Sequence, residues 1–510
     1  MKNYILYAFL ACGMLSSCYD DKGNYDYEEI NRVEISGINE NQPYTKIAFV
    51  DTLRLEPTIQ STLDPKNEYE YEWKLIPAGI DFKDVEEGED FIVSKENKLE
   101  MPITLKAGRY DGYYIVKDKN TGVDWMKKFS LLVKTLTGEG WLVLCDDEGD
   151  SRMDIIFNVD KENDIVAKNT WENKTFQTGK PEKIMYNYNL HRTRTLLVSE
   201  KGTFDLDKQD LHVGEDNNLR WSFGVTPDAI YVKASGMSQF ADKNYWVVVD
   251  ELGDAYALSL STYGGIFEFP INKLNGKEEF VAAPFVGVTY GWFYGCSPIL
   301  MYDQTNKQFL EIRNSASYPS PMRFSGTNLF PCQTGNDFVY GESSKDGTNW
   351  VVLKNSETNQ HYFYGIVMNA EEKNEQKYYG EIKGAGIADA TLFACHHIFP
   401  YLFYVSHNKV YQFDMQHPET PAKEILSYPG EEIKEIKFTP FVAWEPYENW
   451  ERERNYQLLV GTTDTQKDKD HCGIIRMYEV PNLMEPLVKV KEYSGLGNIV
   501  SVTYKERSAN

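Results

Sequence analysis

Two short aromatic clusters are the stretches of this sequence best suited to binding chemistry. They supply six candidate ligand-binding side chains: Tyr290, Trp292, Tyr294, Trp444, Tyr447 and Trp450. Glycines flank the first cluster, and the second is too polar and too interrupted by proline to form a core strand. Aromatic planes beside acids bind sugar rings or peptide side chains by stacking and hydrogen bonding. The alternative is that these rings pack between neighbouring structural units. Arg452 and Arg454, beside the second cluster, could form salt bridges to a partner.

The other reactive residue types lack the spacing of a catalytic or metal site. His396 and His397 are adjacent, so on a strand they point to opposite faces and are poorly placed to grip one metal. The acidic loops at 146–150 and 464–470 are short of calcium ligands, and the second lacks the glycine of an EF-hand loop. No nucleophile elbow, P-loop or dinucleotide fingerprint occurs. We therefore predict no catalytic residue, no metal and no cofactor. The enzyme alternative is a glycosidase-like surface hydrolase that uses paired carboxylates.

Charge and cysteine content narrow the class of protein further. The chain of 510 residues carries a formal net charge of −24, and no lysine or arginine cluster offsets it. Such a surface repels polyanions, so nucleic acid is excluded as a partner. The cysteines that follow residue 18 are scattered rather than closely paired, which predicts buried thiols instead of a disulfide framework.

A strand–turn–strand pattern recurs along residues 138–510. The last apolar residue before each turn is Leu144, Val198, Val249, Tyr302, Leu353, Val405 and Val460, at intervals of 51 to 55 residues. A period near fifty with strands in every unit is typical of a β-propeller. We expect about seven blades, with six and eight as alternatives because the first and last units are the least regular. The strand at 498–504 should share a blade with the strand that begins at Trp141, since closure removes exposed edges.

Residues 28–137 predict a compact β-sandwich of the Ig/PKD type, so the whole chain is expected to be all-β. Alternating stretches at 52–56 and 69–75 are typical of half-buried strands. Trp73 occupies a central strand, where Ig-like domains bury a tryptophan between their sheets, and the stretch at 107–110 resembles the Gly-x-Tyr entry of PKD domains. This unit contains no cysteine, which excludes an Ig disulfide. Its expected role is that of a spacer or docking module.

The N-terminus reads as an export signal. Residues 1–17 combine a positive Lys2 with a short apolar run, which predicts a signal peptide rather than a membrane span. The sequence Leu15-Ser16-Ser17-Cys18 resembles the lipobox of bacterial lipoproteins, which implies that Cys18 is acylated and that residues 18–27 form a lipidated tether. Acyl chains on one residue can hold a protein on a bilayer without a spanning helix.

The tether carries a family resemblance. The acidic pair Asp20-Asp21 resembles the surface-export signal of Bacteroidetes lipoproteins, and residues 21–27 resemble the start of the PKD-like lipoproteins of that phylum. Members of that family are typically found beside SusC/SusD-type outer-membrane importers. The resemblance implies a lipid-anchored protein on the extracellular side of the outer membrane, with a SusC-like TonB-dependent barrel and a SusD-like lipoprotein as partners. The implied function is a non-catalytic accessory subunit for nutrient uptake that binds or presents oligopeptides or glycans. An adhesin or structural scaffold is the remaining alternative.

Overall fold

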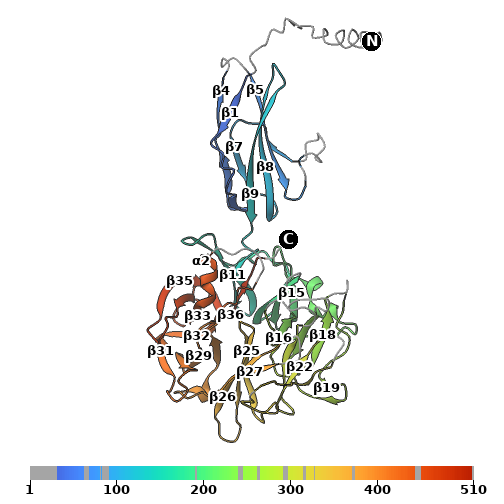
Figure 1. Ribbon diagram of the computed structural model, residues 1–510, viewed down its shortest axis with the longest axis vertical. Helices are drawn as coiled ribbons and strands as arrows, with labels where there is room; N and C mark the ends of the chain where they lie inside the picture. Colours follow the sequence, from blue (N-terminus) through green and yellow to red (C-terminus); the bar gives the residue numbers. More distant parts are fainter. Residues whose placement is uncertain are drawn as a thin grey trace, which may run out of the picture. The chain divides into compact units, whose positions relative to one another are not determined.

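The computed structural model describes most of the chain after residue 30. The described residues are 31–62, 68–80, 82, 91–189, 192–238, 245–260, 265–290, 297–313, 318–326, 328–369, 374–442 and 449–507. The signal peptide, Cys18 and the tether lie outside them. The chain divides into two compact units, Met1–Val133 and Lys134–Asn510 (Figure 1). Both units are built from strands, as the sequence predicts, and no helix in the described part is long and apolar enough to cross a membrane.

Unit 1 consists of antiparallel strands in three sheets. A five-stranded sheet has the order β2(Tyr44–Ile47), β9(Asp124–Lys134), β8(Gly108–Asp118), β5(Tyr69–Pro77) and β6(Ile92–Ser94). Two strand pairs accompany it: β1(Val33–Ser36) with β4(Thr58–Ser61), and β3(Thr52–Leu55) with β7(Leu99–Pro102). The predicted strand at 69–75 is therefore the central β5, paired with β8 and β6.

One apolar cluster holds unit 1 together, and Trp73 lies in its centre. Trp73 is fully buried, as the sequence predicts, and its ring centroid lies 4.3 Å from that of Tyr114. Its indole N–H donates to the carbonyl of Glu96 at 2.8 Å, which satisfies the one polar atom that burial would otherwise leave unpaired. Leu53 and Leu55 of β3 belong to the same cluster, so the small pair β3–β7 packs onto the large sheet.

Unit 2 is a succession of small antiparallel sheets. Within the described residues, seven sheets of three or four strands follow one another. Each sheet is given with its strands in order from the inside of the ring outward. The first three sheets are β36(Asn498–Lys505), β10(Gly140–Asp147), β11(Asp150–Asn158) and β12(Asp164–Ala167); β13(Pro181–Asn189), β14(Arg192–Ser199) and β15(Gly202–Leu206); and β16(Val232–Met237), β17(Tyr245–Asp250) and β18(Ala255–Ser259). The last four are β21(Ile299–Asp303), β22(Gln308–Ile312) and β23(Ser320–Pro321); β24(Asp337–Ser343), β25(Thr348–Lys354), β26(His361–Val367) and β27(Glu375–Glu381); β28(Leu392–Cys395), β29(Tyr401–Ser406), β30(Lys409–Asp414) and β31(Lys423–Ser427); and β32(Glu431–Lys437), β33(Gln457–Asp464), β34(Gly473–Glu479) and β35(Val488–Leu496).

Short elements complete unit 2. They are the strand pair β19(Lys273–Leu274) and β20(Glu278–Glu279), the helix α2(Asn449–Glu453), and the 3-10 turns η2(Glu215–Asn217), η3(Leu219–Ser222), η4(Ile387–Asp389) and η5(Arg454–Tyr456).

The recurring apolar residues of the sequence mark one strand position. Leu144, Val198, Val249, Leu353, Val405 and Val460 lie on the second strand of their sheet, in β10, β14, β17, β25, β29 and β33. Tyr302 lies on β21, which takes the equivalent place because Gly287 of the preceding segment pairs with its inner side. Buried apolar side chains from successive sheets interleave, as Leu142 and Leu144 do with Leu197 of the next sheet. The predicted hairpin turns also form. Gly202 and Gly253 adopt positive φ there, at +114° and +81°, a conformation that glycine reaches without strain.

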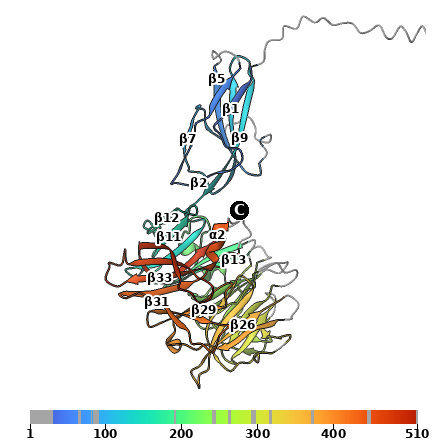
Figure 2. The ribbon, with the colours of Figure 1, turned by 60° about the vertical axis from the view of Figure 1, so that its left-hand side comes forward.

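The sheets close into a ring, the arrangement of a β-propeller. β36 pairs with β10, so the two ends of unit 2 share one sheet, as the sequence predicts. The innermost strands then touch in a circle, β36 to β13, β13 to β16, and β24 through β28 and β32 back to β36. Residues 286–290 fill the gap: Gly287 pairs with Leu300 of β21, and the backbone N–H of Val288 donates to Ser343 at 2.9 Å. The first and last sheets are neighbours in both views (Figure 1, Figure 2).

Candidate functional site

The ends of the innermost strands form the mouth of the ring. All of these strands run in the same direction, because each is antiparallel to the second strand of its sheet and these second strands are equivalent. Their last residues, and the turns that follow, therefore surround one opening. We call this opening the mouth and define it by Tyr290, Lys345, His397, Arg452 and Glu506, which follow five different inner strands.

Direct contacts link neighbouring parts of the mouth. The turn after β24 lies against Thr289 and Tyr290, since a side-chain atom on Gly347 would come within 3.2 Å of Thr289. Ser344 in the same turn hydrogen-bonds Nδ1 of His397 at 3.1 Å. On the other side of the opening, both carboxylate oxygens of Glu506 accept the backbone N–H of Val442 at 3.0 Å. The mouth is thus held together by turns from successive sheets.

Charges at the mouth influence one another across the opening. Burial raises the pKa of Tyr290, and the negative charge of Glu506 raises it further although Glu506 follows β36, several strands away around the ring. Burial lowers the pKa of Lys345, and the nearby guanidinium of Arg452 lowers it further, while Glu506 acts in the opposite direction. No ion pair reaches the Lys345 ammonium group among the described residues. The charges of Arg452 and Glu506 therefore both act on Lys345 at this opening.

The two histidines differ in their hydrogen bonds. Nδ1 of His396 accepts the backbone N–H groups of Ile398 and Phe399 at 3.1 and 2.9 Å, so His396 shapes the turn after β28. His397 is 6 % exposed, and its Nε2 has no hydrogen-bond partner in the described part of the chain. Burial lowers the pKa of His396 to about 4 and that of His397 to about 3, so both rings are neutral at pH 7.

Below the mouth, charged side chains occupy the centre of the ring. Lys183 of β13 has an exposed side chain. Its pKa is nevertheless lowered, first because the surrounding protein disfavours the charged form and then because Lys437 of β32 is also positive. Burial likewise raises the pKa of Glu342, whose carboxylate accepts the hydroxyl of Tyr340 at 2.8 Å. β13 and β32 are separated around the ring by β36 alone. Charged side chains from these inner strands therefore influence one another, and the centre of the ring is polar.

The structure describes two of the six aromatic candidates. Tyr290 is half-buried at the mouth, at the end of the inner segment of its sheet, and Trp450 is half-buried on α2, which follows β32. Tyr290 and Trp450 thus lie at the ends of, or after, inner strands on the same side of the ring. Trp292, Tyr294, Trp444 and Tyr447 lie outside the described residues.

The expectation that Arg454 is available to a partner is wrong. Its guanidinium carbon lies 4.4 Å from the ring centroid of Trp450, and its side chain is 7 % exposed and 3.9 Å from Asp164. A cation over an indole ring beside a buried carboxylate is a stable internal arrangement. Arg452, by contrast, is exposed.

A network of ion pairs holds α2 beside the mouth. Arg507 binds both carboxylate oxygens of Glu139 at 3.0 Å and also reaches Glu451 of α2. Lys505 of β36 donates to the carbonyl of Gly138 at 3.0 Å. The first residues of unit 2, its last described residues and α2 therefore meet in one place. This explains how a helix of five residues, too short to be stable alone, keeps its position.

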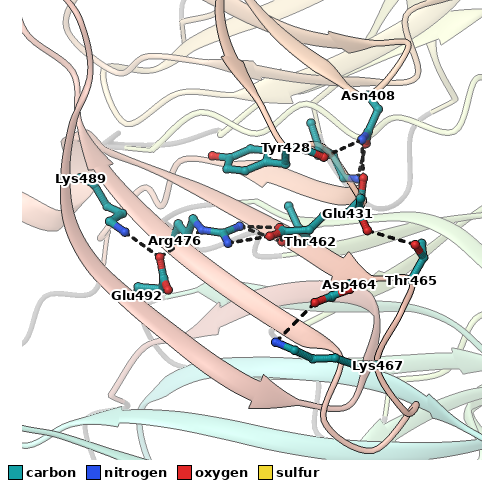
Figure 3. Close-up of polar contacts among 12 residues, drawn as sticks. Asn408, Tyr428, Glu431, Thr462, Asp464, Thr465, Lys467, Arg476, Lys489 and Glu492 are labelled. Carbon is teal, nitrogen blue, oxygen red and sulfur yellow. Dashed lines mark hydrogen bonds and ion pairs between the residues drawn. The ribbon is translucent and has the colours of Figure 1, made fainter.

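At the opposite end of the inner strands, a second polar network braces the last sheet. Figure 3 shows the Arg476 guanidinium pointing toward Glu431, which it binds through two nitrogens at 2.7 and 2.9 Å. Glu492 accepts from Nε of Arg476 at 3.1 Å, and Arg476 lies 4.7 Å from the ring centroid of Tyr428. Every nitrogen of this guanidinium is used inside the chain, so the arrangement is structural.

Replacing Arg476 by alanine is expected to lower the free energy of unfolding by about 2–4 kcal/mol, because Glu431 would remain nearly buried without its bidentate partner. R476K should have an intermediate effect, since an ammonium group cannot reproduce the planar fork. The control is Lys489→Ala, because Lys489 is half-exposed and pairs with the outer Glu492. Chemical denaturation measures all three. Equal losses for R476A and K489A would contradict a bracing role.

The acidic loops and the cysteines take part in the fold. Asp150 accepts the N–H groups of Thr178 and Gly179, both at 2.9 Å, and the carboxylate of Asp464 caps its own turn. No group of three metal-ligating side chains occurs among the described residues. Cys145, Cys395 and Cys472 are buried free thiols and Cys332 is half-buried, which agrees with the prediction for these four; Cys296 is not described.

Sequence reasoning missed Lys345, His397 and Glu506 as parts of one site. His397 follows Lys345 by 52 residues and Glu506 follows His397 by 109, and the sequence around each is unremarkable by itself. A signal did exist, because residues at corresponding places in successive repeats of a propeller meet around its axis. Aligning the repeats by their inner strands would have brought these residues together.

A hollow of about 550 Å³ lies elsewhere, at the outer edge of the sheet of β23. It is lined by Met322, Phe324, Asn328, Leu329, Phe330, Pro331 and Cys332. Asn328 is the one polar side chain among these lining residues, and none of them is charged.

Comparison with known proteins gives one family match and several structural likenesses. A model of the PKD-like family matches residues 18–180, which include unit 1 and end directly before β13. No curated protein matches the chain. Among solved structures, a quinonprotein alcohol dehydrogenase-like protein from Bacteroides thetaiotaomicron is 13 % identical, with a TM-score of 0.39, and the match covers 89 % of this chain and 96 % of that one.

Two further structures have comparable scores. A protein from Lactobacillus plantarum is 10 % identical, with a TM-score of 0.43 and coverage of 72 % of this chain and 100 % of that one. The β-propeller domain of Cps50 (Swd1) from Myceliophteria thermophila is 6 % identical, with a TM-score of 0.39 and coverage of 67 % and 100 %. Identities this low assign no activity to the present chain.

Proposed function

We propose that this protein is a cell-surface binding protein, lipid-anchored at Cys18 in the outer membrane. It acts as a non-catalytic accessory subunit of a SusC/SusD-type importer and binds or presents oligopeptides or glycans. The observation that carries the binding role is the common position of the two described aromatic candidates. Tyr290 and Trp450 are 160 positions apart in the sequence, yet both follow inner strands on the side of the ring where the mouth opens.

The finer architecture belongs to the same proposal. Each of the seven sheets is one blade, and unit 1 is an Ig/PKD-like sandwich that acts as a spacer or docking module. A rigid ring suits a binding subunit, because connections on one side can hold a ligand while the outer strands remain available to a partner protein. The match of residues 18–180 to the PKD-like family supports the assignment of unit 1. The proposed partners rest on the resemblance of the tether to lipoproteins found beside SusC/SusD-type importers.

The test is co-purification from detergent-solubilised outer membranes, with the full chain tagged at Asn510. Mass spectrometry should find a TonB-dependent barrel and its lid lipoprotein retained in stoichiometric amounts. The matched control is Cys18→Ser, which cannot be acylated and should lose both the membrane location and the barrel. If the wild-type protein elutes alone from an intact membrane extract, the accessory role is refuted.

A further inference from the structure

The mouth combines two cations with a buried donor. Lys345, in the turn after β24, is half-buried and forms no ion pair among the described residues. Arg452 of α2 lies close enough to disfavour the charged form of Lys345. Like charges held near one another cost free energy unless an anion lies between them. Glu506 supplies one negative charge, and Asp346, the other acid of this turn, is already paired with Lys377.

His397 adds a hydrogen-bond donor at the same place. The Ser344 hydroxyl and Nδ1 of His397 share a hydrogen bond at 3.1 Å, and in the tautomer in which Ser344 donates, the proton of the neutral ring is on Nε2. Nε2 has no hydrogen-bond partner in the described part of the chain, although the side chain is buried. A buried donor without a partner is costly, and an acceptor supplied by a ligand would satisfy it.

We infer that the mouth binds its ligand through a carboxylate group, held by Lys345 and Arg452 with the His397 N–H as a further donor. Charge-assisted hydrogen bonds are stronger than hydrogen bonds between neutral groups, so the carboxylate would fix one end of the ligand. In a chain with a net charge of −24, the local pair of cations also sets this opening apart from an otherwise acidic protein. The inference rests on the proposed binding function and gives its ligand a chemical class. Two sources supply such a carboxylate: the C-terminus of an oligopeptide and the uronic acid of a glycan.

Isothermal titration calorimetry on the full chain at pH 7 distinguishes these sources with four probes. They are N-acetyl-tetraalanine as the free acid and as the C-terminal amide, and tetragalacturonic acid as the free acid and as its methyl ester. One of the two acids should bind at least about tenfold more tightly than its neutral counterpart, because a lost charge-assisted hydrogen bond is worth about 1.5–3 kcal/mol. The acid that binds identifies the source.

Lys345→Met tests the residue itself. It should weaken binding of the acid about tenfold and leave binding of the neutral probe unchanged, while folding is preserved because Lys345 has no partner to lose. The matched control is Lys354→Met, a half-buried lysine at the other end of the same sheet, which should change neither affinity.

Each result decides the question. Equal affinity for an acid and its neutral counterpart would refute the carboxylate site and leave the proposed binding function standing. An unchanged ratio of acid to neutral affinity in K345M would refute the role of Lys345. Binding of none of the four probes would overturn this inference together with the ligand half of the proposed function, whereas the partner half is decided by the co-purification alone.

Discussion

Replacing Asp154 by alanine is expected to lower the free energy of unfolding of unit 2 by about 3–5 kcal/mol. Asp154 of β11 is fully buried, and its carboxylate binds Nε of Arg152 at 2.9 Å. It also accepts the backbone N–H groups of Asn169 at 2.7 Å and Gly497 at 2.9 Å. Gly497 directly precedes β36, so this one carboxylate joins the N-terminal part of the closing sheet to its C-terminal strand. Its removal would leave a buried guanidinium and two N–H groups without their acceptor.

Asp470 provides the control for this prediction. It contacts the same guanidinium at 3.5 Å but is 62 % exposed. Asp470→Ala should therefore cost no more than about 1 kcal/mol. Guanidinium denaturation followed by tryptophan fluorescence measures both variants, and D154A should move the transition of unit 2 while that of unit 1 stays in place. If the two substitutions cost the same, Asp154 does not secure the ring closure.

The sequence was sufficient to predict the repeat because its signal is local. Leu144, Val198 and the equivalent residues are apolar, precede a turn and recur at nearly constant intervals, and all but Tyr302 lie on the second strand of a sheet. Closure by the strand at 498–504 could be predicted from the need to cover sheet edges. Some inner strands were harder to predict, because they mix polar with apolar residues and lie beside a polar centre. β24, for example, contains Glu342 and no continuous apolar face.

The site could be predicted much less well than the fold, for a physical reason. Its groups come from connections about fifty residues apart, and no local pattern sets Lys345 apart from other lysines in turns. The aromatic clusters were found because several rings stand together in the sequence. Arg454 shows the limit of that reasoning, since its neighbourhood suggested contact with a partner, but the fold places it between Trp450 and Asp164.

The stability of unit 2 is expected to fall as the pH drops below about 6.5, because of His396 and His397. An unfolded histidine takes up a proton near pH 6.5, whereas burial lowers the pKa of His396 to about 4 and that of His397 to about 3 in the folded protein. Between these values the unfolded state binds more protons than the folded state. The free energy of unfolding therefore rises with pH across this window and is lost as the pH falls. Below about pH 3 the loss is complete.

His396→Asn isolates one part of this effect. The asparagine oxygen can accept the N–H groups of Ile398 and Phe399 in place of Nδ1, but it does not titrate. A pKa lowered from 6.5 to about 4 corresponds to about 3 kcal/mol, so this variant should lose about that much less stability than the wild type between pH 7 and pH 4. His407, whose side chain is 70 % exposed, is the matched control, and His407→Asn should leave the slope unchanged. The measurement is the denaturation midpoint at half-unit steps of pH. Identical dependence of stability on pH in the wild type and in H396N would contradict the prediction, because it would show that folding does not change the protonation of His396.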